Sequence, residues 1–317
     1  MSQSKRPIRS LLTELAGDEP LAVASLYRLS DLTRQEFDQV KEVWSTLTAE
    51  RRYSIVQHMA DISEENFQVD FVPFFGFCLQ DAAAWVRRAA LEGLWDTDDA
   101  HLIKPILALL QNDPDIDVRA AAAATLGHYV LLAEWGQFPK NHARPVIEAL
   151  LALLNQDRTP NLVRRAALEA VSSASDERII AHIEAAYHDN SVDLQAAALY
   201  AMGNSADKRW IKIVQQEIQN EDPILCEEAI RAAGNIGASD LVEDIIDRLH
   251  EHEDLAIRLA AVTALGQLGS EQAREALEAR LEDKEAEDLY EAIEEALDEI
   301  DTFANLELLR YSGDEEE

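Results

Sequence analysis

Apolar residues recur along the chain in two alternating helical patterns. In residues 102–110, leucine and isoleucine lie three and four positions apart, which is the spacing of one helix face. A turn cluster of Asn, Asp and Pro follows, and residues 116–126 then carry a second, alanine-rich apolar pattern that Gly127 is expected to end. Neither helix can bury its apolar face alone, so the pattern predicts a helical hairpin that packs on similar neighbours.

The second helix of this hairpin recurs at a nearly constant distance. Matching segments begin at Val86, Val118, Val163, Leu194, Leu225, Ile257 and Leu289, which are 32, 45, 31, 31, 32 and 32 residues apart. First helices are expected near residues 67–79, 144–154, 177–187, 209–218, 240–249 and 271–281, with an earlier pair at 33–47 and 49–61. A period of this size is typical of repeat arrays. The chain is therefore expected to be an all-α protein, an α-solenoid or superhelix of about eight helical hairpins.

The ends of the array and one spacing depart from the repeat. We expect a divergent N-terminal cap at 1–32, the solenoid at 33–302 and an acidic C-terminal tail at 303–317. The 45-residue spacing comes from an insertion at 129–142 that contains Trp135 and Phe138. These two aromatic residues are either exposed anchors for a partner or part of a lengthened second helix and a packed loop. Packing is the favoured interpretation, and the phenylalanines of 67–79 are likewise expected to be mostly core.

Aspartate and arginine also recur at matching positions of the repeat. The pairs are Asp81 and Arg87, Asp113 and Arg119, Asp157 and Arg164, and Asp254 and Arg258. With the run Val-Arg-x-Ala-Ala-Leu that follows the turn, they resemble HEAT repeats, and the period of about 31 residues is similar to the short bacterial variety of phycobilisome-lyase-type proteins. The resemblance covers roughly residues 33–300. It implies a polar ladder between adjacent repeats, interrupted where Gln195 and Cys226 replace the arginine.

The resemblance also implies that the second helices line a concave side of the solenoid. Positions 2, 6 and 10 after the start of each repeated segment lie opposite its apolar positions and form three stripes across the repeats. The first stripe is Arg88, Ala120, Arg165, Ala196, Glu227 and Leu259; the second is Glu92, Ala124, Glu169, Tyr200, Arg231 and Thr263; the third is Asp96, His128, Ser173, Asn204, Asn235 and Gln267. The expected partner-binding residues are Arg88, Glu92, Asp96, His128, Arg165, Glu169, Tyr200, Asn204, Arg231 and Asn235. The amides of the third stripe suit the backbone of an extended peptide, whereas the alternative is an ordinary solvated helix face.

The charge of the chain narrows the kind of partner. With 28 basic and 61 acidic side chains the net charge is −33, which disfavours nucleic acid and anionic membrane surfaces. The acidity either serves solubility or attracts a basic partner. No apolar run predicts a membrane span, and the N-terminus shows no secretory signal. Cys78 and Cys226 lie several repeats apart and are expected to be buried thiols in a reducing compartment, so we expect a cytoplasmic protein. We also expect it to be a monomer.

No motif for catalysis or metal binding stands out. The run His250-Glu251-His252-Glu253 suggests a metal site, but adjacent helical residues do not face one another. A di-iron centre like that of deoxyhypusine hydroxylase would need His-Glu pairs where this chain has Arg88-Ala89 and Arg165-Ala166. We therefore expect the chain to need no cofactor and to have no enzymatic activity. It is expected to be a scaffold or adaptor that binds a protein or peptide on its concave face. The alternative is a lyase-type chromophore chaperone or an enzyme subunit.

Overall fold

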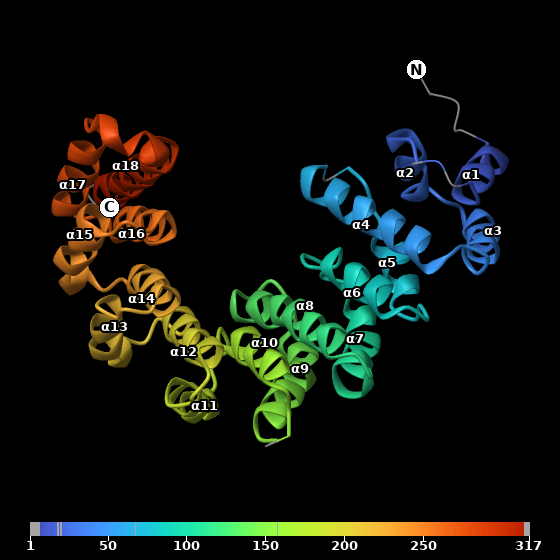
Figure 1. The fold of residues 1–317 in the computed structure, drawn as a ribbon, viewed down its shortest axis with the longest axis horizontal. Helices are drawn as coiled ribbons and strands as arrows, with labels where there is room; N and C mark the ends of the chain where they lie inside the picture. Colours follow the sequence, from blue (N-terminus) through green and yellow to red (C-terminus); the bar gives the residue numbers. More distant parts are fainter. Residues whose placement is uncertain (1–6, 18, 20, 67, 157, 314–317) are drawn as a thin grey trace. The chain divides into compact units, whose positions relative to one another are not determined.

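The computed structural model describes residues 7–313 except 18, 20, 67 and 157. All regular elements in these residues are helical, with 18 α-helices and three short 3-10 segments (Figure 1). The chain divides into two compact units, Met1–Ala170 and Val171–Glu317, which we call the first and second units. The predicted all-α solenoid of helical hairpins is confirmed.

In the first unit, each hairpin places one helix in each of two layers. Its helices are α1 (Ile8–Leu15), α2 (Val23–Leu29), α3 (Arg34–Trp44), α4 (Ala49–Glu65), α5 (Val72–Cys78), α6 (Ala84–Glu92), α7 (Ala100–Asn112), α8 (Ile116–Glu134), α9 (Lys140–Leu154) and α10 (Asn161–Val171). Helix α4 packs on α6, and α6 packs on α8 (Figure 1). We call this row of even-numbered helices, which α10 continues, the second-helix layer of the first unit.

The second unit repeats this arrangement. Its helices are α11 (Arg178–Tyr187), α12 (Val192–Asn204), α13 (Ile211–Ile218), α14 (Pro223–Ile236), α15 (Val242–Glu251), α16 (Leu255–Leu268), α17 (Glu271–Leu281) and α18 (Tyr290–Gly313), with 3-10 segments at Lys208–Trp210, Ser239–Leu241 and Lys284–Leu289. Helices α12, α14, α16 and α18 pack on one another in order and form the second-helix layer of this unit. The first helix of each hairpin packs against its own second helix.

Local signals in the sequence set most helix ends. The side chains of Asp99, Asp115, Asp222 and Asp254 accept hydrogen bonds from the first free backbone N–H groups of α7, α8, α14 and α16. Gly237 and Gly269 end α14 and α16 with φ values of 69° and 61°, a left-handed conformation that favours glycine. These caps explain why the boundaries of the hairpins follow the turn residues of the repeat.

Close contacts between small residues hold the second-helix layers together. Glycines inside four helices face alanines of the next helix: Gly127 and Ala170, Gly203 and Ala232, Gly234 and Ala264, and Gly266 and Ala296. A Cβ atom added to Gly127 would lie 2.9 Å from the Cα of Ala170, which no real contact allows. The prediction that Gly127 ends the second helix is therefore wrong, because this glycine is an internal packing residue of α8.

The insertion at 129–142 lengthens α8 to Glu134 and begins α9 at Lys140. Phe138 is buried against Tyr129, with ring centroids 5.3 Å apart. Trp135 instead follows the last turn of α8 and is 65% exposed. The prediction that these aromatic residues are packed is thus confirmed for Phe138 and wrong for Trp135. The reason is that the chain turns at Gly136, and only Phe138 points back to the helix.

Two other predicted boundaries shift. The helix expected at 67–79 begins at Val72, because Pro73 suits a first helical turn and not a helix interior. Phe71, Phe74 and Phe75 are buried as expected, whereas Phe67 lies outside the described residues. At the other end, α18 remains helical to Gly313, so the predicted acidic tail starts as part of the last helix.

Both cysteines are free and buried, as expected. Burial raises the pKa of the Cys78 and Cys226 thiols, so little thiolate is present near neutral pH. We expect neither thiol to react with a soluble thiol reagent in the native protein at pH 8, and both to react once the chain is unfolded in guanidinium chloride. Rapid labelling of the native protein would contradict this.

In the described part of the chain, no helix is long and apolar enough to span a membrane.

Candidate functional site

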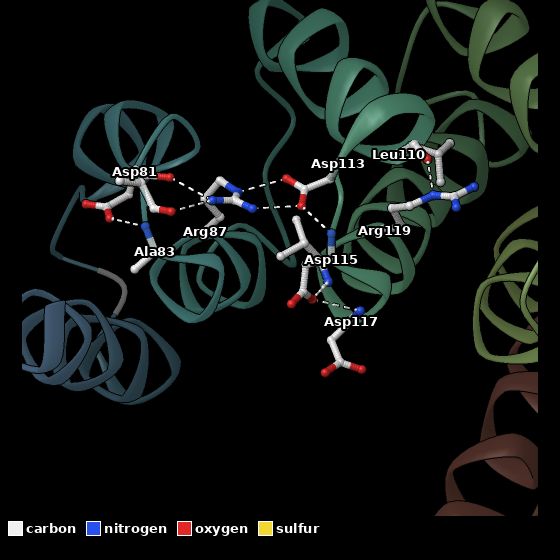
Figure 2. Close-up of polar contacts among 10 residues, drawn as sticks. Asp81, Ala83, Arg87, Leu110, Asp113, Asp115, Asp117 and Arg119 are labelled. Carbon is white, nitrogen blue, oxygen red and sulfur yellow. Dashed lines mark hydrogen bonds and ion pairs between the residues drawn. The ribbon is translucent and has the colours of Figure 1, made fainter.

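The arginine ladder lies inside the array and joins consecutive repeats (Figure 2). The Arg87 guanidinium donates to both carboxylate oxygens of Asp113, at 2.8 and 2.7 Å, and to the carbonyl oxygens of Asp81 and Ala82. Arg52 forms the same bidentate contact with the two carboxylate oxygens of Asp81, at 2.7 and 3.0 Å. The Asp81 and Asp113 side chains are only 4% and 3% exposed. These residues therefore connect repeats and are not available to a partner.

The ladder stops where the arginine is replaced, as the sequence predicts. Arg119 is present but donates to the Leu110 carbonyl of its own hairpin (Figure 2). Asp157, another predicted member of the ladder, lies outside the described residues. The Gln195 amide donates to the Asp189 carbonyl at 2.9 Å and the Cys226 thiol to the Ile218 carbonyl at 3.1 Å, both within their own hairpins. Both side chains thus hydrogen-bond within their own hairpin, whereas Arg52 and Arg87 bind a carboxylate of the next repeat.

A buried carboxylate joins two hairpins in the interrupted stretch. Glu217 of α13 is 5% exposed and accepts hydrogen bonds from the Tyr187 hydroxyl at 2.6 Å and the Asn220 amide at 2.5 Å. Burial and this acceptor raise the pKa of Tyr187 to about 12. Sequence reasoning missed this contact, although Tyr187 and Glu217 lie 30 positions apart, close to one repeat period.

Most of the predicted stripe residues are exposed or half-buried on the second-helix layers. Their arginines are paired one turn along their own helices. Arg88 lies 3.2 Å from Glu92, Arg165 lies 2.7 Å from Glu169, and Arg231 lies 2.8 Å from Glu227. Exposed ion pairs of this kind contribute about 0–1 kcal/mol each to stability.

Four of the predicted residues border one hollow in the first unit. It has a volume of about 380 Å³ and lies across α6, α8 and α10. Its lining is Arg88, Glu92, Asp117, Ala120, Ala121, Ala124, Leu162, Arg165, Ala166 and Glu169. The hollow exists because α8 has alanine at the two stripe positions where α6 and α10 have arginine and glutamate. We call this hollow, floored by alanine and walled by two Arg–Glu pairs, the alanine trough.

Exposed apolar side chains lie beside the trough at the N-terminal ends of the same three helices. Trp85 of α6, Ile116 of α8 and Leu162 of α10 are 49%, 45% and 44% exposed. Such large apolar side chains are uncommon as a group on a free surface and are typical of contact sites. Asp96 and His128, which were also predicted to bind a partner, do not line the trough.

In the second unit the predicted residues form a row of amides. The Asn204 side chain donates to the Ser172 hydroxyl at 3.0 Å. The amide nitrogen of Asn235 lies beside Gly203, and the amide oxygen of Gln267 lies beside Gly234, because a glycine leaves room for them on the preceding helix. Tyr200 is 39% exposed on α12. A separate hollow of about 310 Å³ includes Ser172, Asp176, Asp207 and Trp210.

The two histidines of the run at 250–253 have different local environments. His250 is in the last turn of α15, and His252 follows that helix and accepts a hydrogen bond from the Asp254 backbone N–H at 3.1 Å. Within the described residues, no group of three His, Cys, Asp or Glu side chains is placed to hold a metal ion.

These observations define an all-α solenoid of stacked helical hairpins with an exposed second-helix face in each unit. Residues 72–137 and 211–298 match the family model described as HEAT repeats. The buried Arg–Asp ladder and the glycine–alanine contacts occur within and beyond the matched segments. These two segments of the chain are therefore HEAT repeats.

Several solved structures resemble this chain. Yeast importin-beta, Kap95p, has a TM-score of 0.52 at 14% identity, covering 92% of this chain and 46% of that protein. The CpcE–CpcF complex of phycocyanin lyase from Nostoc sp. PCC7120 has a TM-score of 0.47 at 17% identity, covering 72% and 94%. Human deoxyhypusine hydroxylase has a TM-score of 0.36 at 15% identity, covering 93% and 96%. At these identities the likeness concerns the fold alone, and no curated protein matches the sequence significantly.

Proposed function

We propose that this chain is a non-enzymatic scaffold or adaptor that binds a partner protein on its second-helix face. The alanine trough carries the proposal, because it combines a 380 Å³ hollow with charged and apolar side chains that contribute little to stability. Importin-beta, which shares this fold, is described bound to RanGDP, and CpcE is described in complex with CpcF. A HEAT-repeat solenoid with exposed side chains of this kind favours the same general use.

The charge distribution favours a partner with a basic segment on the second unit. Residues 1–170 contain 17 basic and 24 acidic side chains, a net charge of −7, whereas residues 171–317 contain 11 and 37, a net charge of −26. Such a field accelerates association with a basic partner, and salt screens it over about 8–10 Å at physiological ionic strength. The free, buried cysteines favour a cytoplasmic setting.

The proposal is tested by capture from a lysate of the source cell. In one variant, Arg88, Glu92, Arg165 and Glu169 are all changed to alanine. Its matched control replaces four exposed charges of the odd-numbered helices, Asp38, Lys104, Arg144 and Glu148, with alanine. We expect the amount of partner captured by the first variant to fall at least about tenfold, because side chains at the centre of an interface contribute most of its affinity. The control should retain it.

Equal capture by both variants would contradict a binding role for the trough. No captured protein from any lysate would contradict the scaffold function itself. The chromophore-chaperone alternative would gain support only from a coloured preparation, measured as visible absorbance that stays with the purified chain.

A further inference from the structure

We propose that the alanine trough binds one amphipathic α-helix of a partner protein, a proposal that rests on the function proposed above. The trough lies within one compact unit, and three successive second helices form it. Three features of its surface favour a helix over an extended peptide: its lack of exposed backbone groups, its small residues on α8, and the order of its charges.

The floor consists of Ala120, Ala121, Ala124 and Ala166, whose own N–H and C=O groups are used inside α8 and α10. An extended peptide over this floor would bury its N–H and C=O groups against methyl groups, at a cost of about 1–3 kcal/mol for each unpaired group. A helix brings its backbone hydrogen bonds with it. The trough therefore favours a helical segment.

The shape of the floor supports the same occupant. Ala120 and Ala124 lie one turn apart on α8 and both line the trough, Ala120 buried and Ala124 exposed, at positions where α6 and α10 carry a long charged side chain. Small residues along a helix let another helix approach closely. A partner helix can thus lie over α8, with the Arg88–Glu92 pair on one side and the Arg165–Glu169 pair on the other.

The walls define the charge pattern of the partner. Arg88 and Arg165 occupy the same level of the repeat, and Glu92 and Glu169 lie one turn further along their helices. A complementary helix carries acidic residues at the arginine level and basic residues at the glutamate level. Beyond the arginines, exposed Trp85, Ile116 and Leu162 offer contacts for a large apolar side chain, beside the carboxylate of Asp117.

The second unit lacks this combination and serves as an internal comparison. At the position that corresponds to Ala124, α12 carries Tyr200, α14 carries Arg231 and α16 carries Thr263. Its face instead presents the amides of Asn204 and Asn235, which can bind the backbone of an extended chain. The two units are thus expected to differ in the conformation of what they bind.

A display experiment tests the proposal with defined probes. Random peptides of about 20 residues, long enough for a helix of about 30 Å, are selected on the full chain. Enriched peptides are then assayed against the wild type and three variants. Ala124→Arg fills the trough and places the new guanidinium between Glu92 and Glu169. Ala152→Arg makes the same change at an exposed position of α9. Thr263→Arg alters the position of α16 that corresponds to Ala124. Circular dichroism checks that each variant is folded.

We expect the enriched peptides to have apolar residues at helical spacing, to gain helical signal on binding, and to bind Ala124→Arg at least about tenfold more weakly. Their affinity for Ala152→Arg and Thr263→Arg should stay within about twofold of wild type. Enriched peptides without helical spacing, peptides that bind Ala124→Arg normally, or a selection that yields no binder would overturn the proposal. Peptides lost only on Thr263→Arg would leave the scaffold function standing while placing the binding site elsewhere.

Discussion

Replacing Arg87 with alanine is expected to lower the free energy of unfolding by about 3–5 kcal/mol, because it leaves the buried Asp113 carboxylate without its cationic partner. The same change frees the carbonyl oxygens of Asp81 and Ala82, which Arg87 also binds. Asp113 is 3% exposed, so water cannot readily replace the lost hydrogen bonds. Urea denaturation followed by circular dichroism measures the change.

The neighbouring arginine provides the control. Arg88 lies one position along the same helix, but its side chain is 40% exposed and pairs with exposed Glu92. Arg88→Ala should therefore cost only about 0–1 kcal/mol. A second variant, Arg87→Lys, keeps the charge but cannot bind both carboxylate oxygens at once, and is expected to fall between the two. Equal effects of Arg87→Ala and Arg88→Ala would show that the ladder does not stabilise the fold.

Replacing Gly203 with alanine is expected to destabilise the second unit by about 1–3 kcal/mol through overpacking. Glycine in a helix usually costs about 0.5–1 kcal/mol relative to alanine, so a helical glycine with free space around it would give the opposite sign. Here the added Cβ would lie 2.9 Å from the Cα of Ala232, and a backbone atom cannot move aside alone. Helices α12 and α14 would have to separate.

Two further variants isolate this cause. Gly17→Ala adds a methyl group with only ordinary contacts, at 3.5 Å, and should change stability by less than about 0.5 kcal/mol. The double variant Gly203→Ala with Ala232→Gly restores the space, so its loss should be smaller than the sum of the two single losses. Additive effects, or a stabilising Gly203→Ala, would contradict the close contact between the helices.

Much of the proposed binding face could be predicted because each of its residues belongs to a periodic pattern. A helix turns by a constant angle per residue, so the spacing of the apolar positions also determines which side chains face outward. Arg88, Glu92, Arg165 and Glu169 follow directly from this rule. The alanines of α8 were visible in the same stripes, but a stripe does not reveal depth. Only packing α8 between two helices with longer side chains turns them into the floor of a trough.

By itself, the sequence determined the all-helical class, the repeat period, the Arg–Asp ladder and its interruption at Gln195 and Cys226, since all of these depend on local or strictly periodic signals. The tertiary structure decided the role of Gly127, which a C-terminal glycine signal misassigns because Ala170, its packing partner, is 43 positions away in the sequence. It also decided that Phe138 is buried and Trp135 exposed, and that Glu217 binds Tyr187. The physical reason is common to these cases: whether a small, aromatic or charged side chain is buried depends on which surface of another repeat meets it.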